Sequence, residues 1–371
     1  MKKDDIRFHV VFITLAYKDV SVSDFFNYAV CQVNQAMGLA EQNVRVTVIS
    51  RFSTDKKISR NGVEYYFVND GKSSCLKKWQ LSKKTTNLVF SMNPDIIHLH
   101  GFFFPRFFNY LLRKNKGKSK VVLEYHSDSI PRKLKWIAAR NFRKVDKIIF
   151  ANYQAARLWA KSFSLSENKW AFSIECAPDS KFMKRESARQ ISGFSGFPIF
   201  LWNSRLITRR DPLTVISGFE AFLKLGTYPY SHFYMMIPDC DEALFMELTQ
   251  KIAASELLKN AVSIIKERKP LNKIAAYFNS ADYVISGSLE DGYGYGVADA
   301  MSCGVIPIVT DISTFKQITG NGLVGGLWEA GNAKLLAESI TLTVSRTFPT
   351  IKDEALRVSN YFDKHLSQKA H

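Results

Sequence analysis

The chain has few cysteines and no long apolar run, and both absences exclude classes of protein. Its 371 residues contain five scattered cysteines, an odd number, and no Cys-x-x-Cys pair. Neither a disulfide framework nor a cysteine-based zinc site is therefore indicated, and a reducing cytosol is the simplest compartment. Since no apolar run is long enough to span a bilayer, we expect a protein that is soluble or attached peripherally to the inner face of a membrane.

The first residues resemble a secretory signal only superficially. A basic start precedes an apolar run at Phe8–Leu15, but this run is short and no small-residue cleavage site follows it. We therefore predict that Phe8–Leu15 is a buried first strand.

Acidic residues are scarce relative to basic ones. There are 51 Lys and Arg against 34 Asp and Glu, which gives a formal net charge of +17. This excess favours an anionic partner, such as nucleic acid, an acidic membrane face or a phosphorylated substrate, although solubility alone would also account for it. No nucleic-acid-binding motif is recognisable, so we expect no nucleic-acid partner.

Apolar runs of strand length alternate with stretches of helix length along nearly the whole chain, and the pattern restarts after Ser187. Strict alternation indicates parallel sheets with helices on both faces. We predict an α/β protein with two Rossmann-like doubly wound domains facing each other across a cleft. The predicted strands are Phe8–Leu15, Val44–Ile49, Ile96–His100, Lys120–Tyr125, Lys147–Phe150, Ile199–Asn203, His232–Ile237, Val262–Lys266, Ala281–Ser286 and Val305–Thr310. The predicted helices include Phe25–Glu41, Ile130–Val145, Leu213–Lys224, Leu271–Asn279 and Ile351–Gln368.

The domain boundary is expected in a polar stretch with Ser and Gly, Met183–Phe197. We predict an N-terminal domain at residues 1–185, a C-terminal domain at 186–350 and a helix at 351–371 that packs across the domains.

The most informative segment runs from Ser288 to Gly304. Three glycines after a predicted strand let the main chain approach a ligand, and the helix that follows offers N–H groups and a partial positive charge to a phosphate. Asp291 and Asp299 flank this segment. Because carboxylates repel phosphate, they are better suited to accept hydrogen bonds from sugar hydroxyls. Phosphate beside hydroxyls is the chemistry of a nucleotide sugar.

Two arginines follow the predicted strand Ile199–Asn203. Arg205 and Arg210 lie in a loop before a helix, where guanidinium groups can neutralise a diphosphate leaving group and stabilise its charge. A basic surface loop would show the same pattern, since Arg209 lies beside them.

These segments resemble the retaining GT-B glycosyltransferases of the group 1 (family 4) type. The resemblance rests on Asp291-Gly-Tyr-Gly-Tyr-Gly-Val-Ala-Asp299, followed by Cys-Gly and an apolar strand with Pro. It extends to Asn203-Ser-Arg-Leu-Ile-Thr-Arg-Arg-Asp-Pro, to Pro94-Asp-Ile-Ile-His-Leu-His-Gly101 and to Leu123-Glu-Tyr-His126. The chain departs from the family by having Asp at both family Glu positions. It also lacks the paired glycines expected after the first strand.

The resemblance implies transfer of a sugar from a UDP- or GDP-sugar to a hydroxyl of a saccharide, lipid-linked saccharide or protein glycan, with retention and without a metal or other cofactor. The N-terminal domain would hold the acceptor and the C-terminal domain the donor. Asp291 would hold hydroxyls of the transferred sugar and Asp299 the ribose diol, with Arg205 and Arg210 on the diphosphate. The implied donor site comprises Arg205, Arg210, Lys266, Glu290, Asp291, Tyr293, Gly294, Tyr295, Gly296, Val297 and Asp299.

Several single residues have two explanations. By resemblance His126 would contact the transferred sugar as part of the catalytic set, although a lone His is more often a polar core residue. Lys266 would bind the base, or belong to a solvated charge run. His98 and His100 lie two apart and share a strand face. They suggest a metal pair, but no third ligand is evident, so we expect structural or acceptor-side roles for them together with Tyr17.

A basic and aromatic segment, residues 102–145, suits an anionic bilayer surface because cations and apolar residues alternate at helical spacing. An ordinary helix with its apolar face in the core explains it equally well. Two other functions are also open. One is a nucleotide-sugar epimerase or hydrolase on the same scaffold, and the other is a non-catalytic protein that binds anionic surfaces.

Overall fold

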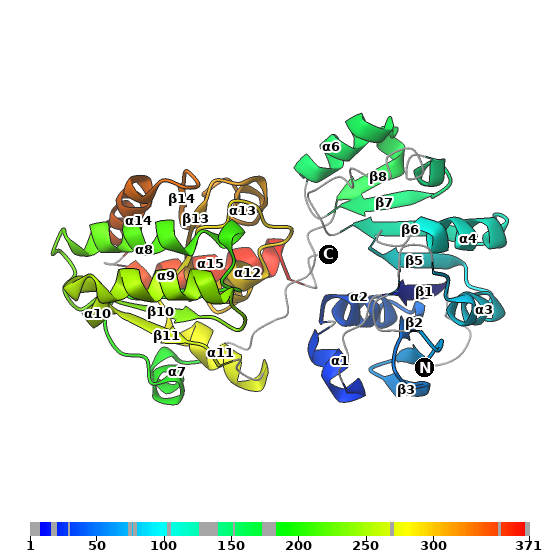
Figure 1. Ribbon diagram of the computed structural model, residues 1–371, viewed down its shortest axis with the longest axis horizontal. Coiled ribbons are helices and arrows are strands. Elements are labelled where there is room, and N and C mark those ends of the chain that lie inside the picture. The colour runs from blue at the N-terminus through cyan, green and yellow to red at the C-terminus, as the bar shows by residue number, and fades with distance from the viewer. Residues whose placement is uncertain are drawn as a thin grey trace. The chain divides into compact units, whose positions relative to one another are not determined.

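The computed structural model describes residues 8–15, 21–28, 30–72, 76, 80–101, 105–125, 140–150, 153–172, 183–267, 271–347 and 350–367. The chain divides into two compact units, Met1–Cys176 and Ala177–His371. Each unit is an α/β layer structure in which helices cover both faces of one sheet (Figure 1). The predicted α/β class with two Rossmann-like domains is confirmed.

The N-terminal unit is built on an eight-stranded sheet in the order β3-β4-β2-β1-β5-β6-β7-β8. Every neighbouring pair is parallel except β3 with β4. Its strands are β1 (His9–Thr14), β2 (Arg45–Arg51), β3 (Lys56–Arg60), β4 (Val63–Val68), β5 (Ile96–His100), β6 (Lys120–Tyr125), β7 (Lys147–Phe150) and β8 (Trp170–Phe172). Its helices are α1 (Val22–Tyr28), α2 (Val30–Glu41), α3 (Lys83–Ser91), α4 (Pro105–Asn115), α6 (Tyr153–Phe163) and the 3₁₀ turn η3 (Glu167–Lys169).

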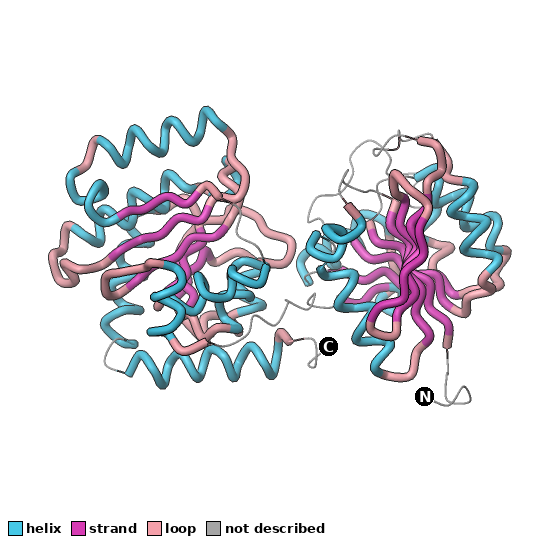
Figure 2. The backbone as a smooth tube through the Cα atoms, turned by 90° about the horizontal axis from the view of Figure 1, so that it is seen from below, coloured by secondary structure: helices cyan, strands magenta, loops and turns pink. Residues whose placement is uncertain are grey.

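The C-terminal unit has six parallel strands in the order β11-β10-β9-β12-β13-β14. They are β9 (Ile199–Asn203), β10 (His232–Met236), β11 (Val262–Ile265), β12 (Tyr283–Ser286), β13 (Ile306–Thr310) and β14 (Gly326–Trp328). The helices are α7 (Arg185–Ser192), α8 (Pro212–Leu223), α9 (Glu242–Ala253), α10 (Glu256–Ala261), α11 (Leu271–Ser280), α12 (Tyr295–Ser302), α13 (Ser313–Ile318), α14 (Ala333–Thr347), α15 (Ile351–His365) and the 3₁₀ turn η4 (Thr208–Arg210). Figure 2 shows the strands of each unit between layers of helix.

In both sheets the order in which the strands are added reverses at one point. In the N-terminal unit successive strands run outward from β1 on one side and from β5 on the other, and in the C-terminal unit they do so from β9 and β12. At such a switch point, the loops that leave the carboxyl ends of two neighbouring strands turn to opposite faces and leave room for a ligand. The topology therefore gives each unit one favoured position for a site.

The first strand shows why the sheet is buried on both faces. Val11 and Ile13 belong to the core under α4 and α6, whereas Val10 and Phe12 belong to the core on the other face of the sheet. A side-chain period of two places alternate residues on opposite faces. The predicted strand Phe8–Leu15 is confirmed with bounds one residue shorter at each end.

Two predictions about the N-terminal unit need correction. The single helix expected at Phe25–Glu41 is two helices, α1 and α2, and α1 begins earlier because Ser21 Oγ accepts the N–H of Asp24 at 3.1 Å and caps it. The hairpin of β3 and β4 was missed, although Asn61 and Gly62 carry its turn with φ of 50° and 77°. The expected helix Ile130–Val145 lies largely outside the described residues.

The start of the C-terminal unit is held by one buried carboxylate. Asp282 accepts from the backbone N–H of Ile199 at 2.7 Å and pairs with Arg185 and Arg189 of α7 at 2.9 and 3.0 Å. Helix α7 packs on α11. These contacts join the residues from 183 onward to the second sheet. The assignment of residues 1–185 to an acceptor domain and 186–350 to a donor domain stays a prediction.

The last helix packs within the C-terminal unit. Helix α15 contacts α12 and β13, and its Val358 and Phe362 are buried. The packing of residues 351–371 across the two domains stays a prediction. In the described part of the chain, no helix combines the length and the apolar character needed to cross a membrane.

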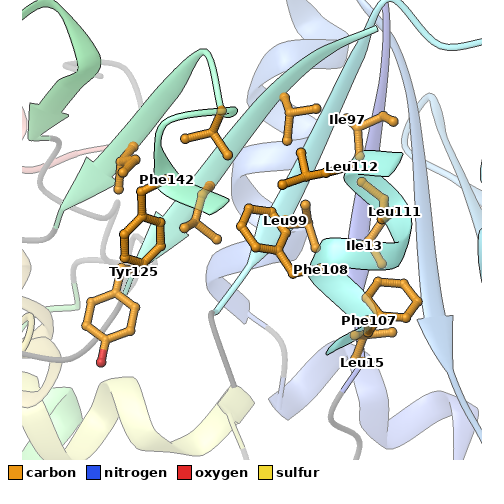
Figure 3. Packing of buried hydrophobic residues seen from close by; sticks show 14 of the residues in the cluster. Ile13, Leu15, Ile97, Leu99, Phe107, Phe108, Leu111, Leu112, Tyr125 and Phe142 are labelled. Carbon is orange, nitrogen blue, oxygen red and sulfur yellow. The ribbon is translucent and has the colours of Figure 1, made fainter. Parts of the chain in front are cut away.

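Helix α4 carries the described part of the basic and aromatic segment. Its apolar residues Phe107, Phe108, Leu111 and Leu112 lie in the core, where they face β5 and β1 (Figure 3). Arg106 and Arg113 are exposed. The helix is therefore an ordinary amphipathic helix, and its apolar side is already occupied by the sheet.

We expect Leu111→Ala to lower the free energy of unfolding of the N-terminal unit by about 2–5 kcal/mol, because it removes a fully buried side chain and leaves a cavity. Arg113→Ala on the exposed side should change it by less than about 0.5 kcal/mol. Urea denaturation of both variants measures this. An unchanged stability in Leu111→Ala would mean that this side of α4 does not contact the core.

Candidate functional site

A polar pocket lies at the switch point of the C-terminal sheet, where β9 and β12 end. It has a volume of about 100 Å³. Strand ends, the loop after β12 and the start of α12 form its walls. The lining residues are Trp202, Asn203, Ser204, Arg210, Val284, Ile285, Ser286, Ser288, Asp291, Gly294, Tyr295, Gly296 and Val297.

Two glycines allow the walls to approach each other. A Cβ at Gly296 would lie 2.6 Å from the backbone oxygen of Asn203, and a Cβ at Gly287 would lie 2.5 Å from Cγ2 of Val215. Both distances are shorter than any van der Waals contact. The start of α12 therefore packs directly on the end of β9 because the chain carries no side chain there.

The start of α12 turns its positive end toward this pocket. Gly294 is the N-cap with φ of 70°, a conformation that suits glycine. Val297 and Ala298 donate their N–H groups to the carbonyl of Gly294 at 3.0 and 2.9 Å. Gly296 precedes these bonds, so its N–H group has no acceptor within the helix, and both Tyr295 and Gly296 line the pocket. Such a helix start suits an anionic group.

Arg210 provides the cation of the pocket. It closes the turn η4, and its Nη1 donates to Ser288 Oγ at 2.8 Å and to the Asp291 carboxylate. Its Nε is buried and has no hydrogen-bond partner among the described residues. A buried guanidinium N–H without an acceptor is costly, so an anionic oxygen that reached this atom would satisfy it.

Asp291 organises the loop that carries it. One carboxylate oxygen accepts from Arg210 and the other accepts the N–H of Gly294 at 3.2 Å, while its carbonyl accepts from the Thr314 hydroxyl. Residues 291–294 are thereby held between η4 and α13. The role in binding sugar hydroxyls that the sequence predicted for Asp291 would have to use its remaining lone pairs.

Asp299 lies one turn further along α12. Its Oδ1 is shielded from solvent and has no hydrogen-bond partner among the described residues. Burial raises the pKa of Asp299 to about 8, because a shielded carboxylate loses its hydration. At neutral pH this side chain is largely protonated in the ligand-free protein. A ligand that donated hydrogen bonds to it would favour the charged form.

The other expected donor residues lie around or outside this pocket. Arg205 is exposed in the loop after β9 and does not line it. Glu290 is exposed and pairs with Arg209 at 3.5 Å. Tyr293 stacks on Tyr295 with a centroid distance of 5.1 Å. Lys266 lies 3.7 Å from Glu242 and 4.0 Å from the centre of the Phe245 ring, so its ammonium group is held near the end of β11.

Two expected residues cannot be placed. His126, expected in the catalytic set, and Tyr17, expected on the acceptor side, lie outside the described residues. Their roles stay predictions.

Sequence reasoning assigned no role to Ser288 or Thr314, which contact Arg210 and Asp291. Ser288 directly follows Gly287 at the end of β12, and this position is a signal that could have identified it. Thr314 gives no such signal, because it comes from α13 and reaches the loop only in the folded unit.

In the N-terminal unit, His98 and His100 on β5 both face Glu124 of β6. The Nε2 atoms lie 3.1 and 3.5 Å from Oε2 of Glu124. The sequence showed no third group beside the two histidines, because Glu124 belongs to a different strand and only the register of β5 and β6 brings it opposite His100.

We expect Gly296→Ala to destabilise the C-terminal unit by about 1–3 kcal/mol, because the added Cβ must displace either α12 or the end of β9. Leu289→Ala is the control, since Leu289 is exposed in the same segment and its truncation should cost less than about 0.5 kcal/mol. Thermal denaturation of the two variants measures the difference. Equal stabilities would show that the two segments are not in contact.

Comparison with known proteins gives a glycosyltransferase match on each unit. Residues 245–357 match the model of glycosyl transferases group 1, and residues 29–171 match that of glycosyltransferase family 4. A GDP-mannose:cellobiosyl-diphosphopolyprenol alpha-mannosyltransferase from Xanthomonas oryzae is 22% identical over 284 residues, which cover 73% of this chain and 71% of that protein.

Solved structures share the fold over nearly the full length. A glycosyltransferase from Rickettsia africae has a TM-score of 0.76 at 17% identity, covering 98% of this chain and 95% of its own. Anabaena HepE, solved in complex with UDP and glucose, has a TM-score of 0.71 at 14% identity, covering 98% and 96%. The two family matches identify the chain as a glycosyltransferase enzyme, and the solved structures show that its two Rossmann-like units have the GT-B architecture.

Proposed function

We propose that the protein transfers a sugar from a nucleoside-diphosphate sugar to an acceptor hydroxyl, with the diphosphate of the donor at the pocket formed by the ends of β9 and β12. The observation that carries this proposal is that Arg210, whose Nε has no hydrogen-bond partner among the described residues, lines the same pocket as the first residues of α12. Together they offer a guanidinium and a helix dipole to one anionic group. A leaving diphosphate has the matching charge, and charge aimed at a leaving group accelerates transfer.

The compared proteins support this choice of donor. HepE was solved with UDP and glucose, and the name of the Xanthomonas enzyme specifies GDP-mannose as its donor. We propose a UDP- or GDP-sugar as the donor for this chain. The same name specifies a lipid-linked saccharide, and we propose a saccharide or lipid-linked acceptor here.

Each residue of the proposed donor site has a chemical task. Arg210 binds the diphosphate through Nε, and the backbone from Tyr293 to Val297 meets the distal phosphate. Asp291 holds Arg210 in place and accepts from hydroxyls of the transferred sugar. Asp299 accepts from the ribose diol. Arg205, exposed in the neighbouring loop, adds a second positive charge, while Lys266 and Glu290 lie at the rim.

Retention and metal independence belong to the same proposal. Arg210 and Arg205 neutralise the diphosphate in the position where other enzymes use a divalent cation, so the donor site needs no metal. Retention follows from attack on the face from which the nucleotide departs. His126 aligns the transferred sugar.

Binding to a membrane would depend on charge in the described part of residues 102–145. The apolar side of α4 packs on the sheet, which leaves its exposed arginines for an anionic surface. Attachment at the inner, cytoplasmic face stays a prediction.

We expect Arg210→Ala to lower kcat/KM for sugar transfer by about 10²–10³-fold, because it removes the charge that stabilises the leaving group. Arg209→Ala is a matched control. Arg209 is the adjacent arginine, is exposed and pairs only with Glu290 among the described residues, so its loss should change the rate by a few-fold at most. The assay measures nucleotide release from a panel of UDP- and GDP-sugars with and without acceptor saccharides.

Three outcomes would contradict the proposal. Equal losses in the two arginine variants would remove the special role of Arg210. A matching collapse of thermal stability in Arg210→Ala would make that role structural. Conversion or hydrolysis of the donor at the same rate without any acceptor would indicate an epimerase or hydrolase.

Donor binding should release a proton from Asp299. The carboxyl is largely protonated at pH 7 because its pKa is raised to about 8, and ribose hydroxyls that donate to it stabilise the charged form and lower the pKa on binding. Affinity for UDP or GDP should therefore rise with pH between 6 and 8, by at most about tenfold per unit. Calorimetry at pH 7 in buffers of different ionisation enthalpy measures the released proton.

Asp299→Asn is the control for this measurement. It should weaken nucleotide binding and remove the dependence of the enthalpy on the buffer. Wild-type binding that is strong but independent of the buffer would show that Asp299 does not meet the nucleotide.

A further inference from the structure

Three metal-ligand side chains converge in the N-terminal unit, outside the donor site. His98 and His100 come from β5 and Glu124 comes from β6, and their ligand atoms all lie within 4.8 Å of one another. The exposed fraction is 8% for His98 and 2% for Glu124, and it is 9% for the side chain of His100. The cluster is therefore almost entirely shielded by the fold.

The strand register builds this cluster. His98 and His100 are two residues apart and share one face of β5, and Glu124 lies directly opposite His100 in the parallel pairing with β6. Phe12 of β1 packs against both imidazoles, at centroid distances of 4.5 and 5.5 Å. The three side chains thus lie near the carboxyl ends of the strands, beside the switch point between β1 and β5, where open parallel sheets place ligands.

Two of the three distances between ligand atoms match a coordination sphere, and all three are within 4.8 Å. The Nε2 atoms of His98 and His100 lie 3.1 and 3.5 Å from the same carboxylate oxygen of Glu124. Zinc bonds of about 2.0–2.2 Å to nitrogen and oxygen place neighbouring ligands of a tetrahedral site roughly 3.4 Å apart. An ion between the three atoms would need only small movements of the side chains.

A hydrogen bond from outside the cluster orients the carboxylate. Gln35 of α2 donates its Nε2 to Oε1 of Glu124 at 3.0 Å, which leaves Oε2 directed at the imidazoles. Metal-binding carboxylates are commonly held by such a partner, which fixes their orientation. The glutamine therefore has the place of a positioning residue.

Two arrangements are compatible with these contacts. If both Nε2 atoms carry protons, they face the Glu124 carboxylate and the cluster is a buried group of polar side chains. If the protons are on Nδ1, the two Nε2 lone pairs and the carboxylate face one point. Two imidazoles and one carboxylate are a ligand set for zinc and similar ions, whereas calcium and magnesium prefer oxygen ligands.

We propose that His98, His100 and Glu124 form a site for one divalent transition-metal ion, with zinc as the best fit and one coordination position left for a water or a substrate oxygen. The site belongs to the N-terminal unit and the proposed donor pocket to the C-terminal unit. The inference does not depend on the assignment of the transfer reaction.

The test uses the full chain after treatment with a chelator and desalting. Zn²⁺ is titrated in competition with a chromophoric chelator, and Co²⁺ is added separately to obtain its visible absorption. We expect one high-affinity Zn²⁺ per chain and a Co²⁺ spectrum of low coordination number. Glu124→Gln and His98→Gln should each weaken the affinity by more than about 100-fold, and Gln35→Ala by about 10–100-fold.

His9→Gln is the matched control. His9 is a buried histidine of the same sheet, on β1, and its Nε2 contacts the Thr47 hydroxyl at 3.0 Å instead of a carboxylate. This variant should bind Zn²⁺ like the wild type. Because every variant keeps the five cysteines, zinc bound to thiols would appear equally in all of them.

The proposal is overturned if the wild-type chain takes up less than one Zn²⁺ at micromolar concentration, or if Glu124→Gln binds as tightly as the wild type. Far-ultraviolet circular dichroism checks that each variant folds. If the ligand variants do not fold, the wild-type stoichiometry and the Gln35→Ala variant still test the proposal. Unchanged Zn²⁺ affinity in Gln35→Ala, together with a Co²⁺ spectrum of high coordination number, would indicate adventitious surface binding.

Discussion

The contact of Arg210 with Ser288 and Asp291 holds together the pocket that we propose for the donor. It joins the loop after β9 to the loop after β12, two segments about eighty residues apart in the chain. Among the described residues, Nε of the same guanidinium is buried without an acceptor. A guanidinium anchored through Nη1 is positioned before any ligand arrives, and in the proposed reaction such preorganisation would make its charge effective.

Backbone geometry provides the rest of that pocket. Gly296 and Gly287 remove the side chains that would separate α12 from β9 and the loop from α8, and Gly294 caps the helix in a conformation that suits glycine. The shape of the pocket therefore depends on the absence of a side chain at these glycines as much as on the polar side chains that line it. Close approach of main chains brings a helix dipole to the same point as the arginine.

The two units place their polar groups by the same rule. In the C-terminal unit the pocket lies where β9 and β12 end, and in the N-terminal unit His98, His100 and Glu124 lie beside β1 and β5. Both positions are switch points, where loops diverge and leave the carboxyl ends of strands open. Parallel topology thus selects where each unit can carry chemistry, and local residues select which chemistry.

Much of the architecture was readable from local pattern. Ile96–His100, Lys120–Tyr125, Lys147–Phe150 and Ile199–Asn203 were predicted with the bounds observed, because a strand buried on both faces is a short apolar run between polar turns. The Gly-rich loop and the helix after it were also readable, since glycine spacing and a helix start are properties of neighbouring residues.

Contacts between segments that are distant in the chain could not be predicted from local sequence pattern. The pairing of Arg210 with Asp291, the support from Thr314 and the third group beside the histidines each join residues from different strands or helices. Local sequence encodes the tendency to form an element, but strand order and register set which side chains meet. For this protein the sequence alone predicted most of the strands and helices and the Gly-rich loop before α12. The tertiary structure decided which side chains contact each other, because strand order and register bring together residues that are far apart in the chain.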